Sequence, residues 1–117
     1  MRFLNLISLV ILTAGTLAIT QTLTTSEAAN HIGEKETVCG QIVGEHTASN
    51  SQGSPTFINL DKPYPHQAFT LLIWSEDRQS VGDLPKTGRI CASGTISQYR
   101  GSPEIVLRDA HSWYVPR

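Results

Sequence analysis

Four histidines are the side chains in this sequence best suited to metal binding or proton transfer. They are His31, His46, His66 and His111. No two of them have the spacing that places a ligand pair on one strand or one helix. His31 and His46 fall in segments expected to be loops, where a solvated imidazole is the ordinary state. The two cysteines lack the C-x-x-C spacing of a zinc site and have no histidine close by. The sequence therefore predicts no metal site.

Nucleophilic catalysis is the second chemistry to consider. Ser102, Asp109 and His111 are the residue types of a catalytic triad, but their closeness along the chain does not suit one. No G-x-S-x-G motif accompanies them, and no glycine-rich phosphate loop is present. Glu76 and Asp77 form a pair of carboxylates, which the start of a short helix explains because acidic side chains are favourable there. We expect neither an enzyme nor a cofactor.

The composition excludes several further classes of protein. The 117 residues suffice for one domain. Nine Lys and Arg against ten Asp and Glu give a formal net charge of −1, which does not fit a polybasic DNA-coating protein. An acidic disordered tail is excluded as well, since it would combine high net charge with few apolar residues, whereas 39% of these residues are hydrophobic. We expect a small globular domain.

Residues 1–28 have the layout of a secretory signal peptide. A positive charge at the second position precedes residues 3–19, which are uncharged and mostly apolar. After a polar stretch, Ser26 and Ala28 place small residues at the two positions that signal peptidase reads. An uncleaved membrane anchor is the alternative, with an apolar run at the short limit for a span of roughly 20 residues. We expect cleavage after Ala28, no remaining anchor, and a mature domain over residues 29–117 that is periplasmic or secreted.

The mature domain is predicted to consist mainly of β-strands, because no 12-residue window shows a helical period. Five segments alternate or are rich in β-forming residues, namely 36–43, 55–61, 69–74, 89–96 and 104–108. Residues 45–54 are polar and rich in breakers, so they predict a flexible loop. The only expected helix lies within residues 75–85, with Ser75 as its cap and Gly82 and Pro85 at its end.

This order of three strands, a short helix and two strands is that of the OB-fold, a five-stranded Greek-key barrel. Gly40 and Gly94 occupy matching places in the first and fourth strands, as expected where strands of a small barrel bend sharply or approach closely. The predicted fold class is therefore all-β, an OB-fold barrel with one short helix between its third and fourth strands.

Three stretches of the chain resemble small bacterial OB-fold proteins. They are TVCGQI, PTFINLDKPYPHQAFTLLIW and ICASGTISQYRGSPEIVL. The superfamily they resemble is the nucleic-acid-binding type, which includes anticodon-binding and helicase-associated OB domains. The stretches cover nearly all of residues 34–109, and the Y-x-G-x-P-E-I turn before the last strand is the most family-like element. The resemblance implies nucleic-acid binding, although typical members are more basic than this chain.

Cys39 and Cys91 fall on the first and fourth strands, which are neighbours in an OB barrel. By the alternation of the two strands, both side chains point away from the apolar face. Export would place them in an oxidising compartment. We therefore predict a cross-strand disulfide, which contributes about 4 kcal/mol on the chain-entropy estimate. Two free buried thiols are the alternative.

Aromatic and cationic residues near the second and third strands suggest a ligand site. OB-folds bind ligands on these strands, between the first long loop and the last turn. Single-stranded nucleic acid is held there by bases stacked on aromatic rings, with Lys or Arg along the backbone. The predicted ligand-binding residues are Lys62, Tyr64, Trp74, Tyr99 and Arg100. Trp74 is expected on the outward face of the third strand, and Tyr99-Arg100 is the best candidate pair. The alternative is that the three aromatic residues close the barrel ends.

Two functions remain open at this point, since a fold does not determine a function. The first is an exported OB-fold module that binds single-stranded nucleic acid or oligonucleotides. The second is a periplasmic module that binds an envelope protein or a glycan and no nucleic acid, which the near-neutral charge favours.

Overall fold

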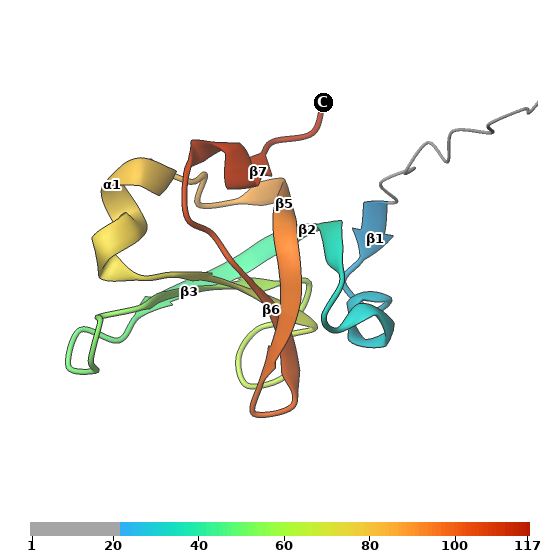
Figure 1. The fold of residues 1–117 in the computed structure, drawn as a ribbon, viewed down its shortest axis with the longest axis horizontal. Coiled ribbons are helices and arrows are strands. Elements are labelled where there is room, and N and C mark those ends of the chain that lie inside the picture. The colour runs from blue at the N-terminus through green and yellow to red at the C-terminus, as the bar shows by residue number, and fades with distance from the viewer. Residues whose placement is uncertain (1–21) are drawn as a thin grey trace, which may run out of the picture.

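The computed structural model describes residues 22–117 and shows a mostly β protein with one short α-helix (Figure 1). The apolar run of the expected signal peptide lies outside the described residues. The strands are β1 (Thr22–Thr24), β2 (Lys35–Thr47), β3 (Thr56–Leu60), β4 (Phe69–Ile73), β5 (Gly88–Tyr99), β6 (Ser102–Val106) and β7 (Trp113–Tyr114). The helical turns are η1 (Ala28–His31), η2 (Ser75–Asp77), α1 (Arg78–Val81) and η3 (Ala110–Ser112). None of the helices among residues 22–117 has the length and apolarity needed to cross a membrane.

All five predicted strands are present, as β2 to β6, and their limits differ in an informative way. β2 continues to Thr47, into the predicted loop, because it pairs with β3 as far as Thr47↔Thr56. β5 likewise continues to Tyr99 because it pairs with β6. His46, expected in a loop, consequently lies on β2, whereas His31 lies in η1. Pairing with a neighbouring strand thus extends these segments beyond what local composition indicates.

The predicted helix is present as η2 followed by α1, and one detail of the prediction is wrong. α1 ends at Gly82, whose φ of 81° is readily adopted only by glycine. Ser75, however, is not a capping residue: it lies inside η2, and no side chain caps the start of that turn. The backbone leaves β4 in an extended conformation at Trp74, so the turn begins one residue earlier than the cap prediction required.

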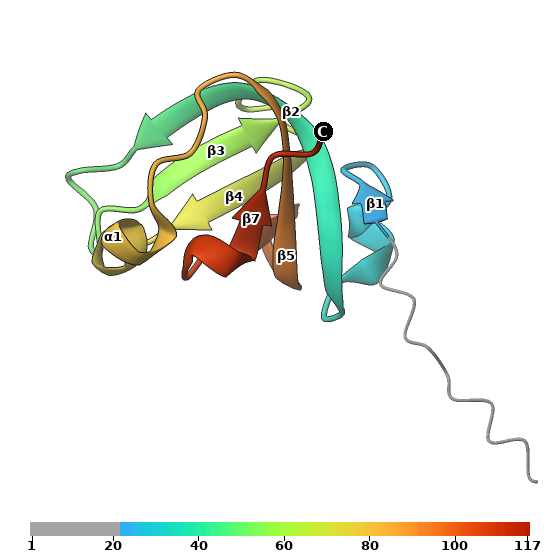
Figure 2. The ribbon, with the colours of Figure 1, turned by 90° about the horizontal axis from the view of Figure 1, so that it is seen from above.

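The strands form one sheet in which β2, β3, β4, β6 and β5 follow one another, and β5 also pairs with β2. The β4–β6 pair is parallel and the other pairs among these five strands are antiparallel. Figure 2 shows how strongly β2 bends between its partners β5 and β3. An irregularity between Ile42 and Gly44 accompanies this bend, as is usual for a β-bulge. The bend allows β2 to pair with β3 at one end of this strand order and with β5 at the other.

One face of each of these strands builds the hydrophobic core. The fully buried side chains of this face include Val38, Leu60, Phe69, Leu71, Ile90, Ile96, Ile105 and Leu107. Burial of each such side chain contributes about 1.5–3 kcal/mol. The two glycines expected at close approaches are confirmed as such. A Cβ on Gly40 would lie 2.7 Å from Thr25 Cγ2, and one on Gly94 would lie 3.0 Å from Ile105 Cγ2.

The predicted disulfide is present between Cys39 and Cys91, which lie opposite each other on β2 and β5 with Cα atoms 4.0 Å apart. Neither side chain belongs to the core cluster, as the alternation predicted, yet both are buried. Two short strands that the sequence did not reveal flank the cross-link. β1 pairs with β2 at Thr24↔Cys39, and β7 pairs with β5 at Cys91↔Tyr114.

The C-terminal tail packs onto the domain. Besides the β7 pairing, the Trp113 indole Nε1 donates a hydrogen bond to the Val81 carbonyl oxygen at 2.9 Å. The tail therefore contacts both β5 and the last residue of α1.

The segment before residue 29, expected to leave with the signal peptide, packs against the domain. Leu23 is 3% exposed and belongs to the core cluster, and Ala28 is fully buried. The Thr25 hydroxyl donates to Asp61 Oδ2, while Asp61 Oδ1 accepts a hydrogen bond of 2.8 Å from the Gln41 amide. Cleavage after Ala28 stays a prediction. It would remove all of β1.

Removal of the disulfide is expected to destabilise the domain. We predict that the Cys39→Ser/Cys91→Ser variant loses about 4 kcal/mol of unfolding free energy, because the bond closes a loop with a sequence separation of 52. Urea unfolding measures the difference. Reduction of the wild-type protein should produce the same loss and leave the double variant unchanged. An unfolding midpoint that does not respond to reductant would contradict this prediction.

The Leu23→Ala substitution tests whether β1 belongs to the folded, mature protein. We predict that Leu23→Ala lowers the unfolding free energy by about 2–5 kcal/mol, because the side chain is buried in the core. Thr22→Ala, at an exposed position of the same strand, should change it by no more than about 0.5 kcal/mol. Urea unfolding would be combined with an intact-mass measurement. Equal stability of the two variants, with a mass that begins at Ala29, would show that β1 is dispensable.

Candidate functional site

Four of the five predicted ligand-binding residues lie at one end of the sheet. Lys62 and Tyr64 occupy the turn that leads into β4, and Tyr99 and Arg100 occupy the hairpin that leads into β6 (Figure 1). The first parts of β4 and β6 lie side by side, with Thr70 opposite Glu104. Tyr64 is 76% exposed and Tyr99 is 54% exposed. Neither ring is therefore packed as a plug for the end of a barrel, which was the alternative prediction.

The Arg100 side chain lies over the Tyr99 ring. Its guanidinium carbon is 5.2 Å from the ring centroid, within the range of a cation–π interaction. The hairpin explains this placement: Arg100 and Gly101 both have positive φ, 50° and 81°, as the two central residues of a tight type I′ turn require. Tyr99 and Ser102 then pair directly across the turn. A stacked cation and an aromatic ring are thus presented together on a short, well-defined hairpin.

Trp74 does not belong to this group, which corrects its predicted place on a strand. β4 ends at Ile73, and all five of its residues are buried. Trp74 follows at the opposite end of β4 from Tyr64, since the strand from Phe69 to Trp74 spans roughly 16 Å at about 3.3 Å per residue. Its half-buried ring packs against Gly53, where a Cβ would come within 2.9 Å of Cε3. The Ser75 amide also donates to the Gly53 carbonyl oxygen at 3.0 Å. Trp74 therefore marks the other end of the sheet, beside loop 48–55.

Two rows of side chains cross the face of the sheet that lies between these ends. We define the β3–β4–β6 face as the outward-pointing residues of the three strands, which alternate with the core residues. One row is apolar and the other is polar. The rows are Phe57, Leu72 and Val106, and Asn59, Thr70 and Glu104. Asn59, Thr70 and Leu72 are buried, and Phe57, Glu104 and Val106 are half-buried, so the face combines apolar and hydrogen-bonding groups but exposes mainly its outer members.

Three buried polar atoms near the Tyr64 and Tyr99 end have no hydrogen-bond partner among the described residues. They are Gln67 Oε1, Thr70 Oγ1 and Ser102 Oγ. A buried polar group without a partner costs about 1–3 kcal/mol. All three atoms are almost completely shielded from solvent, so a ligand reaches them only if the neighbouring side chains move. Sequence reasoning missed them, and the one signal was a threonine inside the apolar strand FTLLI.

The electrostatics of the face are mixed. Burial raises the pKa of the Glu104 carboxyl above its ordinary value, and a hydrogen bond from Ser97 opposes this in part. A cleft of about 430 Å³ continues from Val106 across β5, and its lining includes Lys35 and Arg108. Arg78, another cation of the sequence, is already engaged: its Nη2 donates to Thr56 Oγ1 at 2.5 Å.

Comparison with known proteins supports the fold alone. No family model matches the chain, and no curated protein does. Among solved structures, a putative aspartyl-tRNA synthetase from Leishmania major Friedlin is similar over 84% of this chain, with a TM-score of 0.53 and 9% sequence identity. The chain corresponds to only 21% of the synthetase. This similarity supports an OB-like fold for the present domain.

The raised pKa of Glu104 gives a prediction with a definite sign. A carboxyl whose pKa is raised in the folded state stabilises the fold most at pH values below its ordinary pKa, and this contribution is lost as the pH rises through the folded-state value. The stability of Glu104→Gln relative to wild type should therefore increase between about pH 4 and about pH 8. Urea unfolding at both pH values measures this difference. Glu76→Gln, at an exposed position, should show no such increase, and a relative stability of Glu104→Gln that falls with pH would contradict the assignment.

Proposed function

We propose that this protein is an exported OB-fold module that binds single-stranded nucleic acid or oligonucleotides across the β3–β4–β6 face. The strand order β2-β3-β4-β6-β5, the return pairing of β5 with β2, and the helix between β4 and β5 support an OB barrel. In that fold, β3 and β4 are the second and third strands, on which OB domains bind their ligands. The disulfide is compatible with an oxidising compartment, and we place the protein in the periplasm or among secreted proteins.

The observation that carries the proposal is the pair of exposed tyrosines at one end of this face, with Arg100 stacked on Tyr99. Every base has a π-face, so a tyrosine ring on the surface can stack with any base, at about 1–3 kcal/mol per base. Tyr64 and Tyr99 thus provide two stacking positions on separate turns.

The polar groups around these rings suit the remainder of a nucleotide. Arg100 and Lys62 are exposed cations that can neutralise phosphates. Two phosphate contacts imply a weak salt dependence, with a slope of about −1.4 in log K against log salt. The proposed interaction is therefore of modest affinity and depends mainly on stacking.

Oligonucleotide binding by fluorescence anisotropy tests the proposal. The full, oxidised chain would be titrated against mixed-sequence single-stranded DNA and RNA at low and high salt. Loss of one stacking partner in Tyr99→Ala should weaken binding by about 5- to 150-fold. Arg100→Ala should weaken binding less and reduce the salt slope by about 0.7.

Tyr114→Ala is the matched control, because Tyr114 is 49% exposed but lies on β7, away from the hairpin. It should bind like wild type. Undetectable binding at low salt would contradict the proposal, and so would an equal loss of affinity in Tyr99→Ala and Tyr114→Ala.

The net charge of −1 favours a second candidate, a module that binds a glycan or an envelope protein. Sugar rings also pack on exposed tyrosines and form hydrogen bonds with hydroxyl and amide groups. Glycan binding that is independent of salt, lost in Tyr99→Ala and retained in Arg100→Ala, would favour this candidate over nucleic acid. Recovery of a single protein from envelope extract, again dependent on Tyr99, would identify a protein partner.

A further inference from the structure

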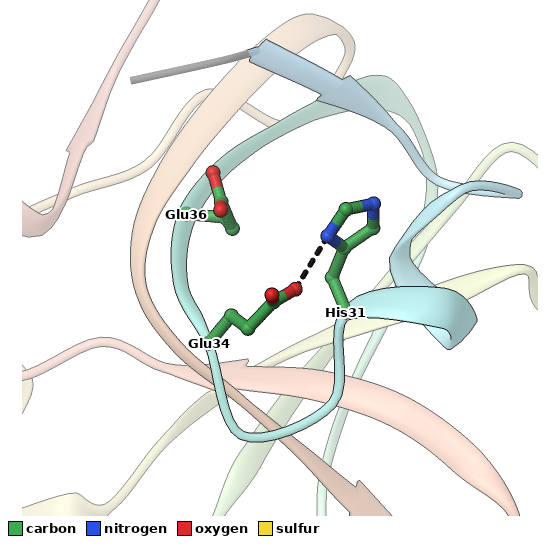
Figure 3. Close-up of side chains that lie close together, drawn as sticks. All are labelled: His31, Glu34 and Glu36. Atoms are coloured by element: carbon green, nitrogen blue, oxygen red, sulfur yellow. Dashed lines mark hydrogen bonds and ion pairs between the residues drawn. The ribbon is translucent and has the colours of Figure 1, made fainter. Parts of the chain in front are cut away.

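Three potential metal ligands gather at the start of β2, away from the face described above. They are His31 in η1, Glu34 in the following turn and Glu36 on β2. One ligand atom from each lies within 4.8 Å of those from the other two. Figure 3 shows the His31 imidazole and the Glu34 carboxylate directed toward each other, with a bond between them and the Glu36 side chain to one side. Histidine spacing predicts no metal site here, because only one histidine takes part and the three residues follow no regular strand or helix spacing.

The backbone that carries these side chains is held firmly against β5. The Gly33 amide donates to the Ile96 carbonyl oxygen at 2.7 Å, and the Ile96 amide donates to the Glu34 carbonyl oxygen at 2.9 Å. Glu36 pairs with Gly94 in the β2–β5 ladder. These contacts hold the backbone of Glu34 and Glu36, and the Glu34 amide donates to the His31 carbonyl oxygen at 3.1 Å, so mainly the side chains must adjust on binding. Preorganisation of this kind lowers the entropic cost of binding a ligand.

A simple ion pair accounts for only part of this cluster. His31 Nδ1 lies 2.5 Å from Glu34 Oε2, which explains those two residues. Glu36 is half-buried, and it takes part in no ion pair found among residues 22–117. A second carboxylate beside the first is unfavourable unless a cation neutralises the pair.

The donor set selects the class of metal. One imidazole nitrogen and two carboxylate oxygens suit a borderline divalent ion such as Zn²⁺, whereas Mg²⁺ and Ca²⁺ prefer oxygen ligands alone. No thiol competes, since both cysteines of the chain form the disulfide. Bonds of about 2.0–2.1 Å around tetrahedral zinc place its ligand atoms roughly 3.3 Å apart. Zinc binding therefore requires the His31–Glu34 contact to open from 2.5 Å and the wider separations, of up to 4.8 Å, to shorten, and the exposed Glu34 side chain is free to rotate.

We propose that His31, Glu34 and Glu36 form a Zn²⁺ site that joins η1 to the start of β2, with water as the remaining ligand. The site does not depend on the proposed nucleic-acid function. Its ligands come from the segment that follows β1 and from β2 itself. Bound zinc therefore stabilises the attachment of the N-terminal segment to the sheet, because an ion that binds only the folded form shifts the unfolding equilibrium.

Zinc titration of the full, oxidised chain tests this proposal. Isothermal titration calorimetry with Zn²⁺ should give one ion per chain, and His31→Ala and Glu36→Gln should each weaken binding by at least about tenfold. His66→Ala is the matched control, because His66 is an exposed histidine in the turn before β4. It should bind zinc like wild type. Mg²⁺ should give no heat of binding at the same concentration.

A second measurement uses the unaltered protein, so it does not depend on the folding of any variant. In NMR spectra of the histidine rings, Zn²⁺ should shift the His31 resonances before those of the other three histidines. Absence of zinc binding would overturn the proposal. So would binding that survives in His31→Ala, an equal loss in His66→Ala, or a first shift at another histidine.

Discussion

The antiparallel pairing of β2 with β5 is the interaction on which the other parts of this structure depend. It runs from Lys35↔Thr95 to Ile42↔Gly88 and carries the Cys39–Cys91 cross-link near its middle. Beyond this ladder, β2 also pairs with β1 and β3, and β5 also pairs with β6 and β7, so each strand takes part in three pairings. Between them the two strands pair with every other strand of the sheet except β4, which lies between β3 and β6. A covalent bond at this point restrains the unfolded chain and holds the ladder in register.

The two candidate sites differ in how this ladder supports them. The zinc ligands lie directly at its end, where Glu36 is a member of the pairing itself. The two tyrosines lie outside the β2–β5 ladder. Tyr99 is the last residue of β5, beyond the ladder, and Tyr64 lies in the turn between β3 and β4. Side chains on a hairpin or turn can adjust to a ligand of variable sequence, whereas a metal needs ligands with fixed positions. The location of each group therefore matches the chemistry proposed for it.

Much of the sheet could be predicted from the sequence because its strands bury one face. Alternation located all five long strands, and the outward alternation of Cys39 and Cys91 on neighbouring strands predicted their bond. β1 and β7 could not be predicted, because strands of three and two residues show no period. They exist only because β2 and β5 offer free edges to them. Local pattern determines the long elements, and tertiary pairing determines the short ones.

The candidate sites were harder to predict for the same reason. Trp74 was expected beside Tyr64, but β4 separates the two by its full length. His31, Glu34 and Glu36 come together through a turn that ends at Gly33, whose φ is 88°. No helical or strand spacing describes that turn. Exposure and missing hydrogen bonds, as at Thr70, become visible only when the neighbouring strands are in place.

The parallel pairing of β1 with β2 has a consequence for how copies of this protein behave toward one another. β1 covers the backbone of residues Thr37, Val38 and Cys39 on one side, and Leu23 fills a position in the core. If processing removes this strand, those amides and carbonyls become an open edge beside an apolar vacancy. Such an edge accepts a strand from another molecule. Retention of β1 would then protect this edge of β2 from strand exchange between copies.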